Sequence, residues 1–208
     1  MYAYGVGALA FSAMVVVGAR LWYDVMQSLW PTSDGMIQGM QFGSFLVVLG
    51  AVGAWRWPGL AAVAVGGTVR DWRVVLSAAV AAAAVTGTFV AITGANAYSD
   101  ADVLFEVVLV PVGEELVFRG VLLGWLLEQL HRRYTAAIAT RWAVILAAVA
   151  FGSAHISNAF FGAGEFAIVQ VLVATLMGLV LGALRIRTGS LIAPIVLHAV
   201  VNGMNLLG

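Results

Sequence analysis

The chain is predicted to fold as an all-α, polytopic membrane helix bundle of seven to eight transmembrane helices. Hydrophobic residues make up 62% of its 208 positions and charged residues only 10%. The mean hydropathy is +1.01, which lies far outside the range of soluble globular domains. Apolar runs of about 17–25 residues, the length at which a helix crosses a bilayer, then recur along the chain. The lipid bilayer is therefore the first expected partner.

Seven apolar runs are long enough to cross, roughly at 3–22, 36–55, 72–95, 102–130, 137–160, 164–184 and 189–207. They are separated by polar or turn-forming stretches such as 31–35, 96–102, 131–133 and 185–189. The run from 58 to 69 is short for a crossing and is either a re-entrant segment or an eighth helix. Since no soluble module, linker or internal repeat is visible, residues 1–208 are expected to form a single integral membrane domain.

Charge and cysteine content exclude several classes of function. The net charge is zero and the chain has no basic run, so nucleic acid is not an expected partner. The absence of cysteine removes disulfides, thiol nucleophiles and cysteine-ligated metals. In the carboxy-terminal half, five arginines share one side under either helix count, and that side is expected to be cytoplasmic: Arg132, Arg133, Arg141, Arg185 and Arg187. The orientation of the amino-terminal spans depends on whether 58–69 crosses.

The candidate functional residues are polar side chains inside the predicted spans: Glu114, Glu115, Arg119, His155, His198 and Asn202. An ionisable group at bilayer depth costs several kcal/mol unless it is paired or solvated, so such groups indicate function. Counted at about 1.5 Å per residue from the arginine-rich side, Glu114 lies about 24 Å deep, His155 about 21 Å and His198 about 14 Å. These depths overlap once helix tilt is allowed for, so the three groups are predicted to meet at one intramembrane cavity.

Helical spacing assigns different environments to the two adjacent glutamates. Glu115 and Arg119 are four residues apart, so they share a helix face and are expected to form a neutralising ion pair. Glu114 is turned by about 100° from Glu115 and is therefore free to face a cavity. His198 and Asn202 also lie four residues apart, which places an imidazole beside an amide on the last helix.

A carboxylate and an imidazole aimed at one water molecule can activate it as a nucleophile, because burial raises the proton affinity of a carboxylate. An imidazole and an amide on a facing helix can donate hydrogen bonds to a developing oxyanion. Together these groups are the parts of a peptide hydrolase without a serine or cysteine nucleophile. No cofactor is needed for that chemistry.

Three alternatives remain open. Glu114, His155 and His198 could ligate zinc in a metalloprotease, although the chain has no His-Glu-x-x-His helix to favour it. A proton-coupled transporter would also place glutamate and histidine in mid-membrane, but it should show repeat symmetry. A non-catalytic immunity protein would not need the complete set of residues.

Three motifs follow one another on successive predicted helices: Glu114-Glu115-x-x-x-Arg119, Phe151-x-x-x-His155 and His198-x-x-x-Asn202. In this order and spacing they resemble the CPBP family of intramembrane proteases, which contains the CAAX prenyl endopeptidases of the Ras-converting type and bacteriocin-processing or immunity proteins. The approach to the last motif, residues 189–194, is also similar to that of the family. The resemblance covers roughly 102–205, which is expected to be the catalytic core.

The resemblance implies that Glu114 and His155 activate water while His198 and Asn202 stabilise the oxyanion, with Glu115 and Arg119 supporting the site. It implies a membrane-tethered protein or peptide tail as substrate, cleaved near its carboxyl end. The small size and composition of the chain are typical of a bacterial protein, so a multi-pass location in the cytoplasmic membrane is expected. Outside the motifs, Gly178 and Gly182 are four residues apart and are predicted to form a helix-packing surface.

Overall fold

The computed structural model describes residues 1–29, 105–156 and 166–206. Among these residues every regular element is helical and none is a strand. The elements are α1 (Tyr2–Leu29), η1 (Phe105–Leu109), α6 (Val110–Glu115), η2 (Leu116–Leu122), α7 (Leu123–His131), α8 (Ala136–Ala154), α9 (Phe166–Thr188) and α10 (Ile192–Leu206). The predicted spans 36–55 and 72–95 and the segment 58–69 lie outside the described residues.

Three described helices are long and apolar enough to cross a membrane: α1, α8 and the Ile168–Thr188 part of α9. Helix α10 is apolar but shorter. The predicted run at 102–130 is present as one continuous helical stretch from Phe105 to His131, in which η1 and η2 are π-helical. These findings confirm the all-α membrane class; the predicted total of seven to eight helices includes runs outside the described residues.

Two predicted helix boundaries are wrong. Helix α8 ends at Ala154 rather than at 160, and His155 is its C-cap with ψ of −8°; the weak helix formers Gly152 and Ser153 precede this end. Helix α10 begins at Ile192 rather than at 189. The cause is Gly189, whose φ of +70° is a conformation that glycine adopts without strain and that terminates α9.

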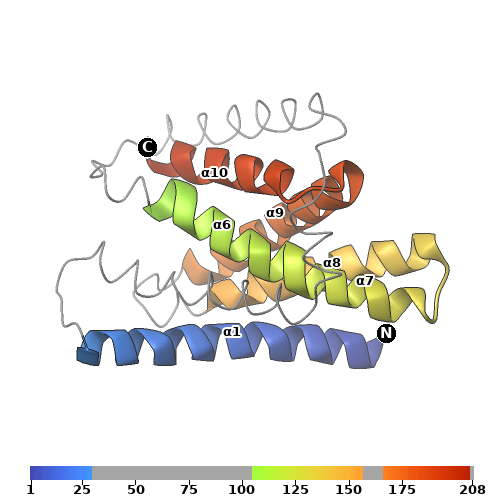
Figure 1. Ribbon diagram of the computed structural model, residues 1–208, viewed down its shortest axis with the longest axis horizontal. Helices are drawn as coiled ribbons and strands as arrows, with labels where there is room; N and C mark the ends of the chain where they lie inside the picture. Colours follow the sequence, from blue (N-terminus) through green and yellow to red (C-terminus); the bar gives the residue numbers. More distant parts are fainter. Residues whose placement is uncertain (30–104, 157–165, 207–208) are drawn as a thin grey trace.

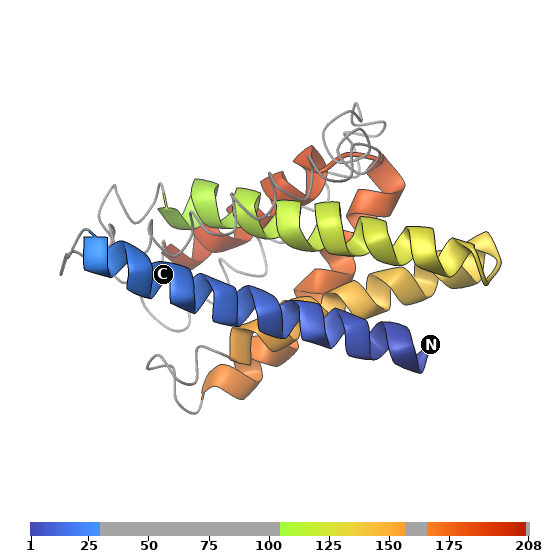
Figure 2. The same ribbon diagram turned by 60° about the horizontal axis from the view of Figure 1, so that its bottom comes forward.

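Helix α8 is the centre of the described bundle because it packs against α1, α7 and α9. Its buried alanines Ala139, Ala143, Ala147 and Ala150 recur at helical spacing and allow close approach of neighbouring backbones. In Figure 1 the helical stretch 105–131 lies between α1 and α10, and Figure 2 shows α10 crossing behind it; α10 packs against η1, α6 and α9. The amino-terminal end of α1 lies beside the turn between α7 and α8 (Figure 1).

The predicted packing role of Gly178 and Gly182 is confirmed at the contact of α8 with α9. A Cβ atom at Gly178 would lie 2.9 Å from the Cα atom of Ala148, and one at Gly182 would lie 3.1 Å from a methyl group of Val144. On the α8 side, a Cβ atom at Gly152 would overlap Thr175 Oγ1. Glycines on both helices therefore set the separation of α8 and α9.

Replacing Gly178 with alanine is expected to lower the free energy of unfolding by about 1–3 kcal/mol, because the backbone of α8 must move to admit the new methyl group. Gly5→Ala is the matched control, since its Cβ would meet only Leu146 at 3.7 Å, an ordinary contact. Unfolding of the two variants in detergent measures the difference. Equal stability of the two variants would contradict the close α8–α9 contact.

Candidate active site

The two adjacent glutamates end α6, which lies between the π-helical segments η1 and η2. Pro111 lies in the first turn of α6; because the helical stretch is continuous from Phe105, its missing N–H leaves a carbonyl of the preceding turn without an intrahelical donor. π-Helical turns inside longer helices are frequent at functional sites because they change the phase of the residues that follow. Glu114 and Glu115 thus point in different directions from a helix that is irregular on both sides.

The Glu115 carboxylate is fully buried and has two partners on two different helices. Its Oε1 atom accepts a hydrogen bond from Arg119 Nη1 at 2.8 Å and lies 2.9 Å from His198 Nδ1. The side chains of Glu115 and Arg119 are 0% and 1% exposed. The predicted ion pair between them is therefore present, but the contact of Glu115 with His198 was not predicted.

Glu114 lies on the other side of the His198 ring. Its Oε2 atom is 3.7 Å from His198 Nε2, and its side chain is 18% exposed, against 7% for His198. The imidazole of His198 is thus placed between two carboxylates, one on each ring nitrogen. Of the two glutamates, Glu114 has the greater access from outside the protein.

The hydrogen-bond partners assign the ring protons of both histidines. A carboxylate and a carbonyl oxygen accept hydrogen bonds, so the nitrogen that faces one must carry a proton. Nδ1 of His198 faces Glu115, and Nδ1 of His155 lies 2.9 Å from the carbonyl oxygen of Phe151. In the neutral form of each histidine, Nε2 is then the basic nitrogen.

Phe151 connects the two histidines to the buried arginine. The guanidinium carbon of Arg119 lies 4.1 Å from the centre of the Phe151 ring, which is a close cation–π contact. The same ring meets His155 at a centroid distance of 4.9 Å and His198 at 5.9 Å, both edge to face. Phe151 is only 2% exposed, so it holds His155 near the cluster without a direct bond.

Asn202 lies one helical turn beyond His198 on α10. Its Nδ2 atom donates a hydrogen bond to the carbonyl oxygen of Glu106 in η1, at 2.9 Å. The interaction joins α10 to the helix that carries the glutamates. The structure therefore brings Glu114, Glu115, Arg119 and His198 into direct contact, adds His155 through Phe151, and ties Asn202 to η1.

Comparison with known families agrees with this arrangement. The family model described as type II CAAX prenyl endopeptidase, Rce1-like, matches residues 96–204. The chain belongs to this Rce1-like family. The resemblance drawn from the three motifs is thereby confirmed, and the match contains all six candidate residues. No curated protein and no solved structure matches the chain.

Membership makes this Rce1-like protein a membrane protein of a protease family. Two features of its site had no signal in the sequence: the contact of His198 with Glu115, and the hydrogen bond from Asn202 to a backbone carbonyl. The first joins residues 83 positions apart and the second residues 96 positions apart. Helical spacing reports only on neighbours within one helix.

A zinc site of the kind predicted would need Glu114, His155 and His198 to converge on one ion. Within the described residues, no three histidine, aspartate or glutamate side chains gather in a geometry that could hold a metal ion. Glu114 and His198 are neighbours, but the ring of His155 lies against Phe151. Glu114, His155 and His198 do not form a three-ligand site in this arrangement.

Replacing Glu115 with leucine is expected to lower the free energy of unfolding by about 3–5 kcal/mol, because Arg119 would be left as a buried charge without its partner. Glu114→Leu is the matched control and should cost clearly less, since its contact is longer and its side chain partly exposed. The double variant Glu115→Leu with Arg119→Leu should recover part of the loss. Unfolding of the three variants in detergent gives the order of their stabilities. A double variant less stable than Glu115→Leu would refute the buried ion pair of Glu115 with Arg119.

Proposed function

We propose that this Rce1-like protein is an intramembrane endopeptidase that hydrolyses a peptide bond near the carboxyl end of a membrane-associated protein or peptide. The observation that supports it best is the pairing of Glu114 with His198 at the exposed edge of a buried charge cluster. A carboxylate that can accept a proton from water and an imidazole that can donate to a developing oxyanion adjoin there, on different helices.

In the proposed mechanism Glu114 and His155 activate the water. Glu114 is the carboxylate that solvent reaches, and Nε2 of His155 is the basic nitrogen of its ring. One of the two takes a proton as the water oxygen bonds to the scissile carbonyl carbon. That proton then passes to the departing nitrogen when the carbon–nitrogen bond breaks, so a carboxylic acid, which then ionises, and an amine are the products.

His198 and Asn202 are proposed to stabilise the negative oxygen of the tetrahedral intermediate. Nε2 of His198 donates a hydrogen bond only when the ring carries a second proton. In that form the four neighbouring charges sum to zero, because Glu114 and Glu115 oppose Arg119 and His198. Asn202 uses one of its two amide N–H groups on the Glu106 carbonyl, which leaves the second to donate.

Substrate and location follow as part of the same proposal. The site lies between helices that are apolar outside, so a substrate tail reaches it through the lipid rather than from bulk water. A membrane-tethered tail, prenylated or carrying another apolar anchor, fits that access. The proposed location is the cytoplasmic membrane of a bacterium, and the proposed mechanism uses no cofactor.

Glu114→Gln is expected to reduce cleavage of a membrane-anchored reporter peptide by about 10²–10⁴-fold, because the amide cannot accept the proton of the attacking water. His155→Ala should act in the same direction. Glu128→Gln is the control, since this exposed glutamate pairs with Arg132 at the far end of α7. Turnover by purified protein in detergent is the measurement, and full activity of Glu114→Gln would sink the mechanism.

Asn202→Ala is expected to lower the turnover number by about 10²–10³-fold, as loss of one oxyanion donor does in other hydrolases. The Michaelis constant should change much less, because the donor acts on charge that develops only in the transition state. A change confined to the Michaelis constant would assign Asn202 to substrate binding instead.

Chelator treatment separates the proposed mechanism from a zinc-dependent one. We expect turnover to survive prolonged dialysis against a strong chelator, because protein side chains perform every step. Elemental analysis of the same preparation is the second readout. Stoichiometric zinc that is lost together with activity, and restores it on return, would establish the metalloprotease instead.

A further inference from the structure

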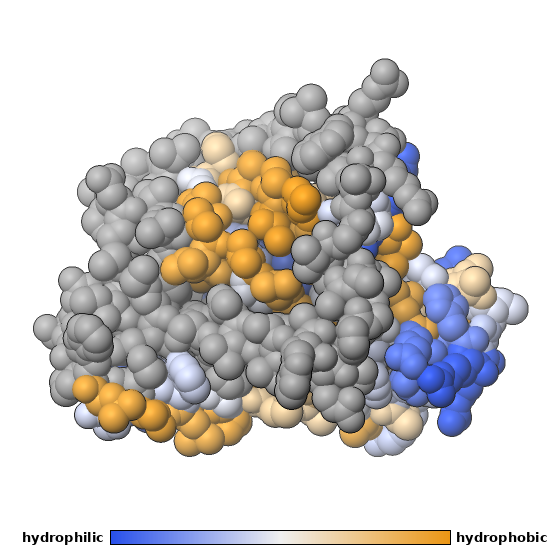
Figure 3. Space-filling model, viewed as in Figure 1, coloured by the Kyte–Doolittle hydropathy of each residue, from blue (hydrophilic) through white to orange (hydrophobic). Residues whose placement is uncertain are grey.

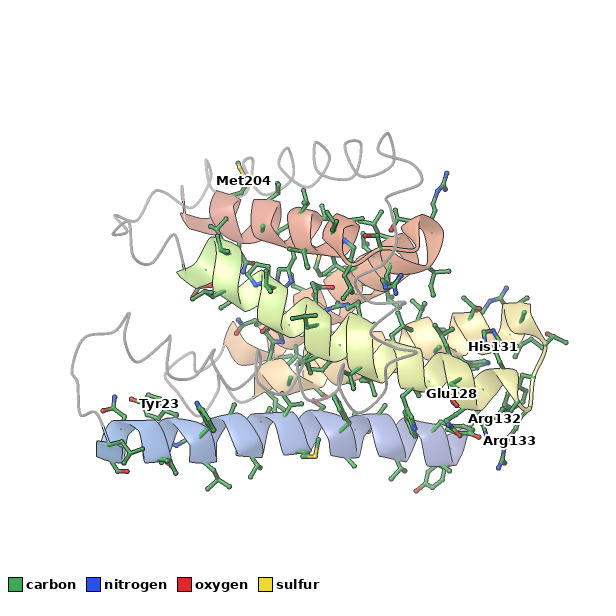
Figure 4. The ribbon with its side chains drawn as sticks, viewed as in Figure 1. Tyr23, Glu128, His131, Arg132, Arg133 and Met204 are labelled. Carbon is green, nitrogen blue, oxygen red and sulfur yellow. The ribbon has the colours of Figure 1, made fainter. Side chains whose placement is uncertain are left out.

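The turn between α7 and α8 is the strongly charged part of the described surface. Figure 3 shows hydrophilic side chains gathered at this end of the molecule, and Figure 4 places Glu128, His131, Arg132 and Arg133 there. All four are at the surface, and the side chain of Arg132 is 67% exposed. None of them contacts the candidate active site.

This turn has an excess of positive charge. Between residues 128 and 141 the chain carries three arginines and one glutamate, a net charge of +2 with histidine neutral. The first turn of α8 has no acidic residue. Arg132 pairs with Glu128 at 2.6 Å, while Arg133 lies over the ring of Tyr4, 5.8 Å from its centre. Within the described part of the chain, two of the three arginines therefore have no carboxylate partner.

Arg141 extends the positive surface along the outer side of α8. Ile138 and Val149 are exposed large hydrophobic residues at helical spacing from Arg141, the exposed Trp142 follows it directly, and Arg141 itself is exposed. It forms no hydrogen bond or ion pair with the other residues that the structure describes. An arginine with an exposed guanidinium thus lies on a helix face that otherwise suits lipid chains.

The depth of Arg141 in the bilayer follows from helix geometry. It lies about 7.5 Å along the axis from Ala136, at five residues of 1.5 Å. Side chains of a helix lean toward its amino terminus, so the guanidinium points back toward the arginine-bearing turn. Trp142 beside it and Tyr2 at the adjacent end of α1, 88% exposed, are residues that prefer the membrane interface. Arg141 thus lies within two helical turns of the end of the molecule that carries these aromatic residues.

We propose that the α7–α8 turn and Arg141 form a binding surface for the head groups of anionic phospholipids. A lipid phosphate would lie between Arg141 and the arginines of the turn, with the acyl chains along Ile138 and Val149. A zwitterionic head group carries its own cation beside the phosphate. An anionic head group lacks that cation, so it is attracted more strongly to a surface with a net charge of +2. The surface is separate from the candidate active site, so this proposal does not depend on the proposed hydrolysis.

The test compares unfolding temperatures in nanodiscs made of phosphatidylglycerol or of phosphatidylcholine. The wild-type protein should unfold at a higher temperature in phosphatidylglycerol. Arg141→Gln should reduce that difference by about 2–4 °C, and Arg141→Lys should retain it because the charge remains. High salt should diminish the difference, since the charges are exposed.

Arg20→Gln is the control, because Arg20 is an exposed arginine paired with Asp24 near the other end of α1. Equal temperatures in the two lipids, or an equal effect of Arg20→Gln and Arg141→Gln, would refute the surface. Glu114→Gln should keep the lipid preference whether or not it abolishes cleavage. The outcome for lipid binding is thus distinguishable from the outcome for catalysis.

Discussion

The interaction on which this structure depends is the buried Glu115 carboxylate shared by Arg119 and His198. A charge with no access to water must be neutralised where it lies, so Glu115 fixes both partners at 2.8–2.9 Å. One partner is on its own helix and the other is on α10. The requirement to pair one charge therefore sets the register of α10 against the 105–131 helix, and this in turn places His198 beside Glu114.

Packing around Phe151 positions the second histidine, His155, relative to the charge cluster. The ring is held on one side by Arg119 and Phe118, and it contacts both His155 and His198. The residue after it is Gly152, where any side chain would meet α9 at Thr175. Phe151 therefore supports the polar cluster on one side of α8. Gly152, on another side of the same helix, allows the close approach to α9.

Local periodicity explains what could be predicted from the sequence. Composition alone predicts the membrane class, and the spacing of four residues predicts the pair of Glu115 with Arg119, because both depend on one helix. The contacts of His198 with Glu115 and of Asn202 with Glu106 depend on how α10 is placed against another helix, which no spacing reports. The early end of α8 at Ala154 and the π-helical turns of η1 and η2 also escape prediction, because an apolar run looks the same in any helical form.

The two neighbouring glutamates show why identical side chains in one motif need not share a role. Glu115 contacts Arg119 and His198 through one carboxylate oxygen and has no exposed surface, so it cannot approach a substrate. Among the described residues Glu114 contacts His198 at 3.7 Å and has a partly exposed side chain, so in the proposed mechanism it is the group that accepts a proton from a bound water molecule. A reactive carboxylate in an apolar medium needs nearby positive charge that does not itself block access. In the proposed mechanism the inner glutamate meets this need by holding Arg119 and His198 in place, and the outer one is the group that reacts.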